Sequence, residues 1–235
     1  MPRPFLTAHW KNLFNATYAV PPELLLARVP PGLALEIREG KAFASLVAFD
    51  FLDTRVLGIG WPGYRHFAEL NLRFYVRHGD IRGVVFLREF VPRRLIAWIA
   101  RWIYNEPYLA APVQSYRQED DQNLSLCYSL KYGGKQHRIA VTASRTPSTP
   151  GEDSIEHFFK EHHWGFGQSR DGKTLRYEVR HPIWPILPIQ NYSLDFDFGA
   201  VYGPEWKFLS DQQPISTLLA VGSEVSVWPH GSLPS

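Results

Sequence analysis

Residues 66–76, HFAELNLRFYV, alternate strictly between two kinds of side chain, and this pattern constrains the fold more than any other feature of the chain. Successive side chains of a β-strand point to opposite faces of its sheet, so the segment predicts a strand with two different faces. The apolar face carries Ala68, Leu70, Leu72, Phe74 and Val76. The opposite face carries Phe67, Glu69, Asn71, Arg73 and Tyr75. That polar face meets either water or the interior of a closed sheet, where its carboxylate, amide and guanidinium groups would form a binding site.

Turn signals elsewhere in the chain indicate an antiparallel sheet. Residues 84–91 follow a glycine-containing turn, so we expect a hairpin between 66–76 and 84–91. Two further hairpins are predicted to turn at Gly133-Gly134 and at Asp171-Gly172. The remaining strand-like segments are residues 42–52, 193–201 and 223–228.

Three short helices are expected between these strands, over residues 22–29, 92–105 and 154–164. Proline suits the first turn of a helix, as at Pro22 and Pro92. No internal repeat or linker divides the chain, so we expect a single domain over residues 1–235, of the α+β class and mainly antiparallel β. An antiparallel sheet of this size usually closes into a barrel or forms a sandwich, which manages its edge strands.

Charge and cysteine content exclude several classes of protein. The formal net charge is +2 and the basic residues are scattered, which argues against nucleic-acid binding. Cys127 is the single cysteine, so a disulfide within the chain and a thiolate metal cluster are excluded. The start, MPRPFLTAHWKN, lacks the apolar region of a secretory signal, and no apolar run approaches the ~18 residues that span a bilayer. We therefore expect a cytoplasmic protein with no nucleic-acid or membrane partner.

The third expected helix carries histidines, which are common metal ligands. His157, His162 and His163 lie near Glu156 and Glu161, but their spacing matches no zinc motif and no HExxH sequence is present. A solvated helical face is the favoured interpretation. The stretch GIGWPG lacks the Lys-Ser/Thr ending of a phosphate-binding loop. We therefore expect no metal and no cofactor.

Several blocks of sequence carry a family resemblance. In order they are WKNLFNATYAVPPELLLARVPPGLALE, AFASLVAFDF, FAELNLRFYV with GVVFL, IYNEPYLAAPV, EHFFKEHHW and YEVRHPIWP. Together, over most of the chain, they resemble the YqjF-like family of bacterial proteins (domain of unknown function 2071). That family is similar in fold to acetoacetate decarboxylase, so the resemblance implies an acetoacetate decarboxylase-like cone-shaped β-barrel with a few short helices.

The resemblance also implies which residues stand at the decarboxylase's catalytic positions. FAELNLRFYV is similar to the enzyme's Tyr-x-Glu strand, which places Glu69 on its catalytic glutamate. Residues 101–109 are similar to its Arg-Glu-x-x-x-Tyr-Pro-Lys-Lys segment, which places Tyr108 on the Schiff-base lysine and Leu109 on its partner. An imine needs an amine, which a phenol cannot replace. We therefore expect no decarboxylation through a Schiff base.

The candidate catalytic residues are accordingly Glu69 and Tyr108. The candidate ligand-binding residues are Lys11, Asn71, Arg73, Tyr75 and Tyr104. Lys11 enters because counting back from Pro30 places it where the decarboxylase has an arginine. We expect an internal cavity that binds a small organic acid or carbonyl compound, with Arg73 or Lys11 at the anionic end of the ligand. Tyr108 would donate a hydrogen bond, and Glu69, its pKa raised by burial, would accept a proton.

Three alternatives remain open at the level of sequence. The first is a lyase or isomerase that uses Glu69 and Tyr108 for acid–base chemistry without a Schiff base. The second is a ligand binder or sensor without turnover, and the third is a structural or partner-binding protein with a filled barrel. Whether the protein is an enzyme, and whether it forms a homo-oligomer, are both left open.

Overall fold

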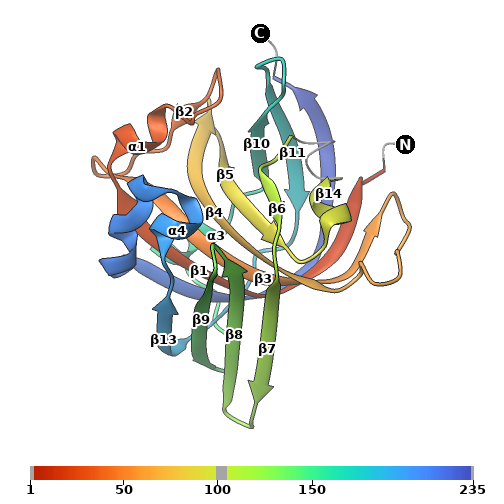
Figure 1. Ribbon diagram of the computed structural model, residues 1–235, viewed down its shortest axis with the longest axis vertical. Helices are drawn as coiled ribbons and strands as arrows, with labels where there is room; N and C mark the ends of the chain where they lie inside the picture. The colour runs from red at the N-terminus through yellow and green to blue at the C-terminus, as the bar shows by residue number, and fades with distance from the viewer. Residues whose placement is uncertain (1–2, 99–104, 234–235) are drawn as a thin grey trace.

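The strands of the main sheet pair in a closed ring. The computed structural model describes residues 3–98 and 105–233. The ring follows the order β4-β3-β1-β14-β11-β10-β5, and β5 pairs back to β4. Its strands are β1 (Leu6–Val20), β3 (Ala42–Val56), β4 (Phe67–His78), β5 (Ile81–Val91), β10 (Trp164–Gln168), β11 (Thr174–Arg180) and β14 (Ser216–Ser232). The pairing between β10 and β5 is parallel, whereas the other neighbours in the ring are antiparallel. Figure 1 shows these strands curving around a common interior.

Three short strands extend the ring at its margins. β2 (Ala34–Leu35) pairs with β4, and β12 (Ile186–Leu187) pairs with β14. β6 (Tyr108–Ala110) runs parallel to β5, with Tyr108 opposite Glu89. This last pairing is the one that matters for the site, because it brings the residues after Pro107 onto the sheet.

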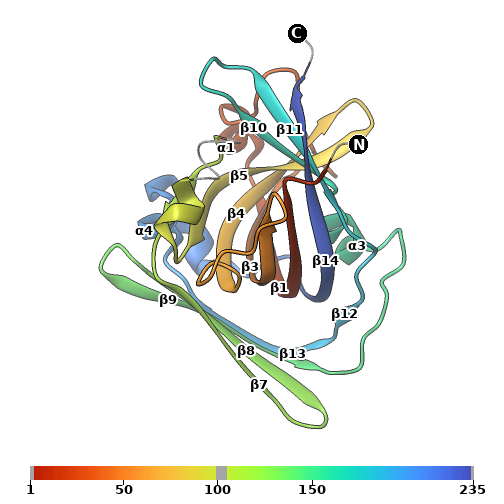
Figure 2. The same ribbon diagram turned by 90° about the vertical axis from the view of Figure 1, so that its right-hand side faces the viewer.

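A second, four-stranded sheet crosses one side of the ring (Figure 2). Its order is β13 (Ile189–Asp195), β9 (Lys135–Ser144), β8 (Asn123–Tyr132) and β7 (Val113–Glu119). Alternate residues of β8 and β9, such as Leu126, Tyr128 and Val141, are buried against the outer face of the ring. The main hydrophobic core therefore lies between the two sheets and outside the ring.

Strand β4 shows how the alternating sequence is used. Its apolar face, which includes Leu70, Leu72 and Phe74, belongs to the core between the sheets. Its other face points into the ring, where Glu69 and Asn71 are almost fully buried. The polar face of residues 66–76 therefore faces the interior of a closed sheet and not bulk water.

The helices are short. They are α1 (Pro22–Leu26), α3 (Ile155–Lys160), α4 (Phe198–Tyr202) and the 3-10 helix η1 (Pro204–Asp211). The Ser154 side chain accepts a hydrogen bond from the His157 N–H and so caps α3. Residues 94–98 are helical, and the remainder of the helix expected up to residue 105 falls mainly on 99–104, outside the described residues. No helix within residues 3–98 and 105–233 is long and apolar enough to cross a membrane.

The fold class expected from the sequence is confirmed, as are its three hairpins. The turn at Gly133-Gly134 has a positive φ at both residues, which glycine adopts without strain. Two expectations are wrong. Residues 193–201 do not form one strand, because β13 ends at Asp195 and α4 begins at Phe198. The histidine-bearing segment is not a solvated face, since His162 is buried and Glu161 has a side chain that is only 5% exposed.

Candidate functional site

The ring encloses a cavity of about 430 Å³, which we call the central cavity. Most of its wall is aromatic or aliphatic, from residues such as Trp10, Phe49, Phe86 and Val179. Polar and ionisable side chains also reach it: Thr54, Glu69, Asn71, Arg73, Glu89, Glu106, Tyr108, His162 and Tyr177. A largely apolar pocket with a few convergent polar groups is typical of a small-molecule site.

Glu69 lies at the centre of the polar wall. Its Oε1 accepts a hydrogen bond from Asn71 Nδ2 at 2.9 Å, and its Oε2 accepts one from the Tyr108 hydroxyl at 3.0 Å. Asn71 is two residues further along the same strand, so the strand itself places the amide beside the carboxyl group. Tyr108 comes from β6, far away in sequence. The expected pair of an acid and a phenol is therefore in direct contact inside the ring.

Two further carboxyl groups lie beside Glu69. Glu89 lies on β5, where it is opposite Asn71 of β4 on one side and opposite Tyr108 of β6 on the other. Glu106 is two residues before Tyr108, and its side chain hydrogen-bonds to Tyr177. All three acids are at most 4% exposed. We call Glu69, Glu89 and Glu106 the acid cluster.

Burial and mutual repulsion make these carboxyl groups hold their protons. Burial raises the pKa of Glu69 to about 7, although Asn71 and Tyr108 donate hydrogen bonds that act in the opposite direction. Burial raises the pKa of Glu106 to about 8, with a further contribution from the charge of Glu69. The pKa of Glu89 is raised well above its ordinary value, by burial and then by the charges of both neighbouring acids. The acid cluster therefore offers proton donors near neutral pH.

Arg73 supplies the positive charge in the cavity. It lies on the same face of β4 as Glu69, four residues away, which is roughly 13 Å along a strand. Its Nη2 donates a hydrogen bond to the Phe159 carbonyl at 3.3 Å, and its buried Nε has no hydrogen-bond partner among the described residues. The polar wall therefore has two poles, the acid cluster and a guanidinium.

The mouth of the cavity is apolar. Leu57, Ile59 and Trp61, from the loop between β3 and β4, line it and remain more than half exposed. Leu95, from the helical residues 94–98, also lines it and is 41% exposed. The described part of the helix expected over 92–105 thus contributes apolar side chains to the mouth. An exposed apolar rim around an apolar cavity favours entry of a ligand with a hydrophobic part.

The structure brings four of the candidate residues together in the central cavity, whereas Tyr75 and Lys11 lie elsewhere. Glu69, Asn71, Arg73 and Tyr108 all line the central cavity. Tyr75 does not line the cavity and is fully buried, with its hydroxyl 2.5 Å from Ser45 Oγ. Tyr104 lies outside the described residues.

Lys11 is not in the central cavity. It lines a separate hollow on the outer side of the ring, together with residues of β7, β8 and β9. The register of β1 against β3 shifts between Lys11 and Phe14, and Asn12 has a φ of 58°. Trp10 and Leu13 on either side of this irregularity line the central cavity. The bulge accommodates the extra residue and leaves Lys11 facing outward.

Sequence reasoning missed Glu89 and Glu106. A β-bulge explains why Glu89 was missed. Arg73 of β4 pairs with Phe86 of β5, but its neighbour Leu72 pairs with Arg88, so β5 has one extra residue at this point. Val84, Phe86 and Glu89 therefore face the cavity, whereas strict alternation would have selected Arg88. Glu106 precedes Pro107 in an irregular segment, which carries no periodic signal. The acidic residue in the block IYNEPYLAAPV was its only sequence marker.

The ring and its enclosed polar wall define a protein of the acetoacetate decarboxylase-like fold. The structure is similar to acetoacetate decarboxylase from Legionella pneumophila, with a TM-score of 0.66, 16% identity, and coverage of 100% of this chain and 88% of that one. An acetoacetate decarboxylase-like enzyme from Sphingomonas wittichii RW1 gives a TM-score of 0.67 and 14% identity, over 99% of this chain and 94% of that one. The enduracididine biosynthesis enzyme MppR gives a TM-score of 0.67 and 16% identity, over 99% of this chain and 88% of that one. Identities this low show a common fold only.

The chain belongs to the family DUF2071, described as "Uncharacterized conserved protein (COG2071)", whose model matches residues 7–224. It is similar to uncharacterized protein YqjF of Bacillus subtilis (strain 168), with 26% identity over 224 residues, covering 94% of this chain and 89% of that protein. The YqjF-like resemblance drawn from the sequence blocks is confirmed.

Proposed function

We propose that the protein binds a small organic acid or carbonyl compound with a hydrophobic part in the central cavity. The observation that carries this proposal is the two-pole polar wall in an otherwise apolar cavity of about 430 Å³. Arg73 would pair with a carboxylate of the ligand. The acid cluster and Tyr108 would donate hydrogen bonds to a carbonyl oxygen, and the aromatic wall would cover the hydrophobic part.

The state of the acid cluster supports a neutral or anionic head group. The pKa of Glu106 is raised to about 8 and that of Glu89 is raised well above its ordinary value, both chiefly by burial, which favours protonated carboxyl groups that donate a hydrogen bond. The Oε1 atoms of both have no hydrogen-bond partner among the described residues. Buried polar atoms are normally paired, which makes them suitable partners for a ligand. The structural neighbour MppR was solved complexed with pyruvate, a small organic acid, which is consistent with such a head group.

The proposed mode of binding does not involve an imine. No lysine within residues 3–98 and 105–233 lines the central cavity, and residues 99–104, IARWIY, contain none. Tyr108 occupies the place at which the resemblance puts the Schiff-base lysine. Incubation with pyruvate or acetoacetate followed by borohydride should therefore leave the mass of the protein unchanged. A stable adduct detected by mass spectrometry would contradict this part of the proposal.

Acid–base catalysis is a second candidate, favoured by one observation. Glu69 has a pKa of about 7 and touches a phenol, so it is able to exchange protons near neutral pH. A carbonyl compound held by Arg73 and Tyr108 would present an acidic C–H to Glu69. Exchange of that hydrogen with deuterated solvent, followed by NMR, distinguishes this candidate from simple binding. Exchange with wild type and none with Glu69→Gln would support it.

A thermal-shift screen tests the binding proposal. Pyruvate, acetoacetate and phenylpyruvate are compared against wild type, Glu69→Gln, Arg73→Gln and the surface control Glu205→Gln. Glu205 pairs with Arg28 and lies outside the central cavity. We expect a keto acid to raise the unfolding temperature of wild type and of Glu205→Gln, with about tenfold weaker binding by the two cavity variants. Equal shifts in all four proteins would overturn the proposal, and so would no shift with any keto acid.

A further inference from the structure

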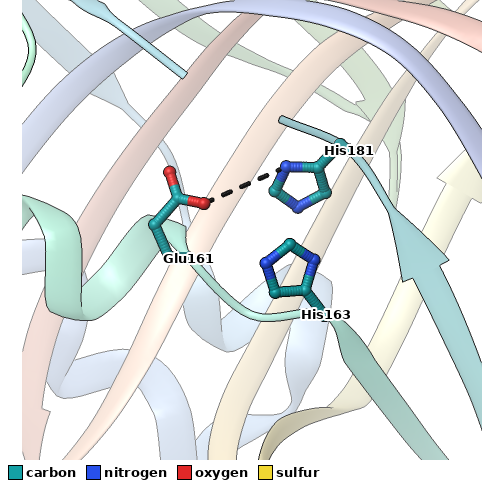
Figure 3. Close-up of side chains that lie close together, drawn as sticks. All are labelled: Glu161, His163 and His181. Carbon is teal, nitrogen blue, oxygen red and sulfur yellow. Dashed lines mark ion pairs between the residues drawn. The ribbon is translucent and has the colours of Figure 1, made fainter. Parts of the chain in front are cut away.

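A second group of potential ligands lies outside the central cavity. Glu161 is the C-cap residue that follows α3, His163 immediately precedes β10, and His181 immediately follows β11. Their side chains come from two segments, 161–163 and the end of β11, and point toward one another (Figure 3), with one ligating atom of each within 4.8 Å of the others. None of the three lines the central cavity, so the inference below is independent of the proposed function.

Backbone contacts determine which nitrogen of each histidine is available. His163 Nδ1 lies 3.2 Å from the carbonyl oxygen of Val179, and His181 Nδ1 lies 2.9 Å from that of Pro182. A carbonyl oxygen only accepts hydrogen bonds, so each Nδ1 carries the proton and each Nε2 keeps a lone pair. Metal-bound histidines usually donate their other ring N–H to a backbone carbonyl or carboxylate in this way. The pair is therefore held in the tautomer that a metal needs.

Glu161 contributes an unpaired oxygen atom. Its side chain is 5% exposed, and that of His181 is 1% exposed. Oε1 accepts hydrogen bonds from the Lys160 ammonium and, at 3.3 Å, from the Trp184 N–H. Oε2 has no hydrogen-bond partner among the described residues and lies 4.0 Å from His181 Nδ1. A buried carboxylate oxygen without a partner is unfavourable, and a cation beside it would remove that cost.

We propose that Glu161, His163 and His181 bind a divalent zinc ion through Glu161 Oε2 and the two Nε2 atoms. Two imidazoles and a carboxylate are common zinc ligands at ~2.0–2.2 Å, with a fourth position left for solvent or a small ligand. Tetrahedral ligand atoms at these lengths lie roughly 3.4 Å apart. The two imidazole rings now stack with 4.5 Å between their centroids, and the His181 ring has Nδ1 toward Glu161 Oε2, so binding requires the rings to rotate and bring Nε2 to the ion. The ion ties the end of α3 to β10 and β11.

Lys160 places a positive charge next to the proposed zinc site. Its side chain is fully buried and paired with Glu161. The ammonium holds Oε1 and leaves Oε2 for the metal, but its positive charge repels a cation. A Lys160→Met variant removes that repulsion and also leaves Glu161 as an uncompensated buried charge. We therefore expect it to be less stable than wild type without metal, and to gain more stability than wild type when zinc is added.

Zinc titration of chelator-treated, full-length protein tests the site. The readouts are metal content after gel filtration, affinity by competition with a chromophoric chelator, and the visible spectrum of the cobalt(II) form. We expect one zinc per wild-type chain and the intense absorption of tetrahedral cobalt. His163→Gln, His181→Gln and Glu161→Gln should each bind zinc at least about tenfold more weakly. Glu161→Gln keeps an oxygen for Lys160 and so guards against a result caused by misfolding.

A matched control is available on the surface. His66 Nε2 lies 3.9 Å from Asp53 Oδ1, and the two form an exposed histidine–carboxylate pair. His66→Gln should bind zinc as wild type does. Failure of wild type to retain zinc, or equal zinc affinity in wild type and all three ligand variants, would overturn the proposal. Neither result bears on the binding of keto acids in the central cavity.

Discussion

The Tyr108 hydroxyl donates a hydrogen bond to Glu69 Oε2 at 3.0 Å, across 39 positions of sequence. The contact exists because β6 pairs in parallel with β5, which itself pairs with β4. It joins an acid and a phenol within a closed ring of strands. The first two predictions follow from this contact and from its burial.

Tyr108→Phe should raise the pKa of Glu69 further above about 7. The hydroxyl stabilises the ionised carboxylate, and a hydrogen bond to a charged group contributes about 1.5–3 kcal/mol. Carbon-13 NMR titration of labelled glutamate carboxyl groups measures the shift. Tyr75→Phe is the matched control, because the Tyr75 hydroxyl contacts Ser45 and does not contact Glu69. A Glu69 pKa that is unchanged in Tyr108→Phe would contradict the contact.

Glu69 should make the protein less stable as the pH rises. Its folded-state pKa of about 7 lies above the ordinary value of 4.5, so its contribution is fully present below pH 4.5 and is lost as the pH rises through 7. The loss amounts to at most about 3 kcal/mol. Glu89, Glu106, Tyr108 and Arg73 face the same group and broaden the transition. Urea unfolding from pH 4.5 to 8.5 should show a shallower decline for Glu69→Gln than for wild type. Parallel pH profiles of the two proteins would disprove the assignment.

Leu72→Ala should destabilise the fold without altering the cavity. Leu72 is fully buried in the core between the two sheets, on the face of β4 opposite Glu69. Removing a buried leucine side chain costs about 2–5 kcal/mol. Leu26→Ala, at a position that is 58% exposed, should change the free energy of unfolding by less than about 0.5 kcal/mol. Denaturant unfolding measures both, and similar losses in the two variants would show that β4 is not buried on this face.

Gly165→Ala should displace Tyr177 and disturb the acid cluster. A Cβ atom at Gly165 would lie 2.1 Å from Tyr177 Cζ, and Tyr177 hydrogen-bonds to Glu106. Overpacking of this kind costs about 1–3 kcal/mol, and loss of the hydrogen bond raises the pKa of Glu106 above about 8. Gly151→Ala meets no heavy atom within 4 Å and serves as the control. Unfolding free energies and carboxyl NMR give both readouts. A Gly165→Ala protein as stable as the control would show that the tyrosine ring moves aside freely.

Local pattern was sufficient for much of the fold. Strict alternation identified β4 and its two faces, and paired turn glycines located the hairpin of β8 and β9. Side-chain alternation did not predict which residues face the cavity in the irregular segments. The bulge at Lys11–Phe14 turned Lys11 outward, and the register shift in β5 placed Glu89 and not Arg88 in the cavity. The sequence patterns do not predict strand β1, although it is a 15-residue element of the ring.

Several expectations remain predictions. They are the single domain over residues 1–235, the cytoplasmic location, the oligomeric state and the absence of nucleic-acid and membrane partners. Tyr104 keeps its candidate role as a ligand-binding residue. Ligand binding by Lys11→Met would test whether Lys11 contacts a ligand in its own hollow.

By itself, the sequence determined the fold class, the family resemblance, the strand with one polar face, and the pairing of Glu69 with Tyr108 as candidates. These depend on side-chain period and on short blocks, which are local properties of the chain. Only the tertiary structure decided that the polar face is enclosed, that Glu89 and Glu106 join Glu69, and that Glu161, His163 and His181 converge. The physical reason is that closure of a sheet, bulges and the meeting of distant segments depend on contacts between strands, which no local periodicity records.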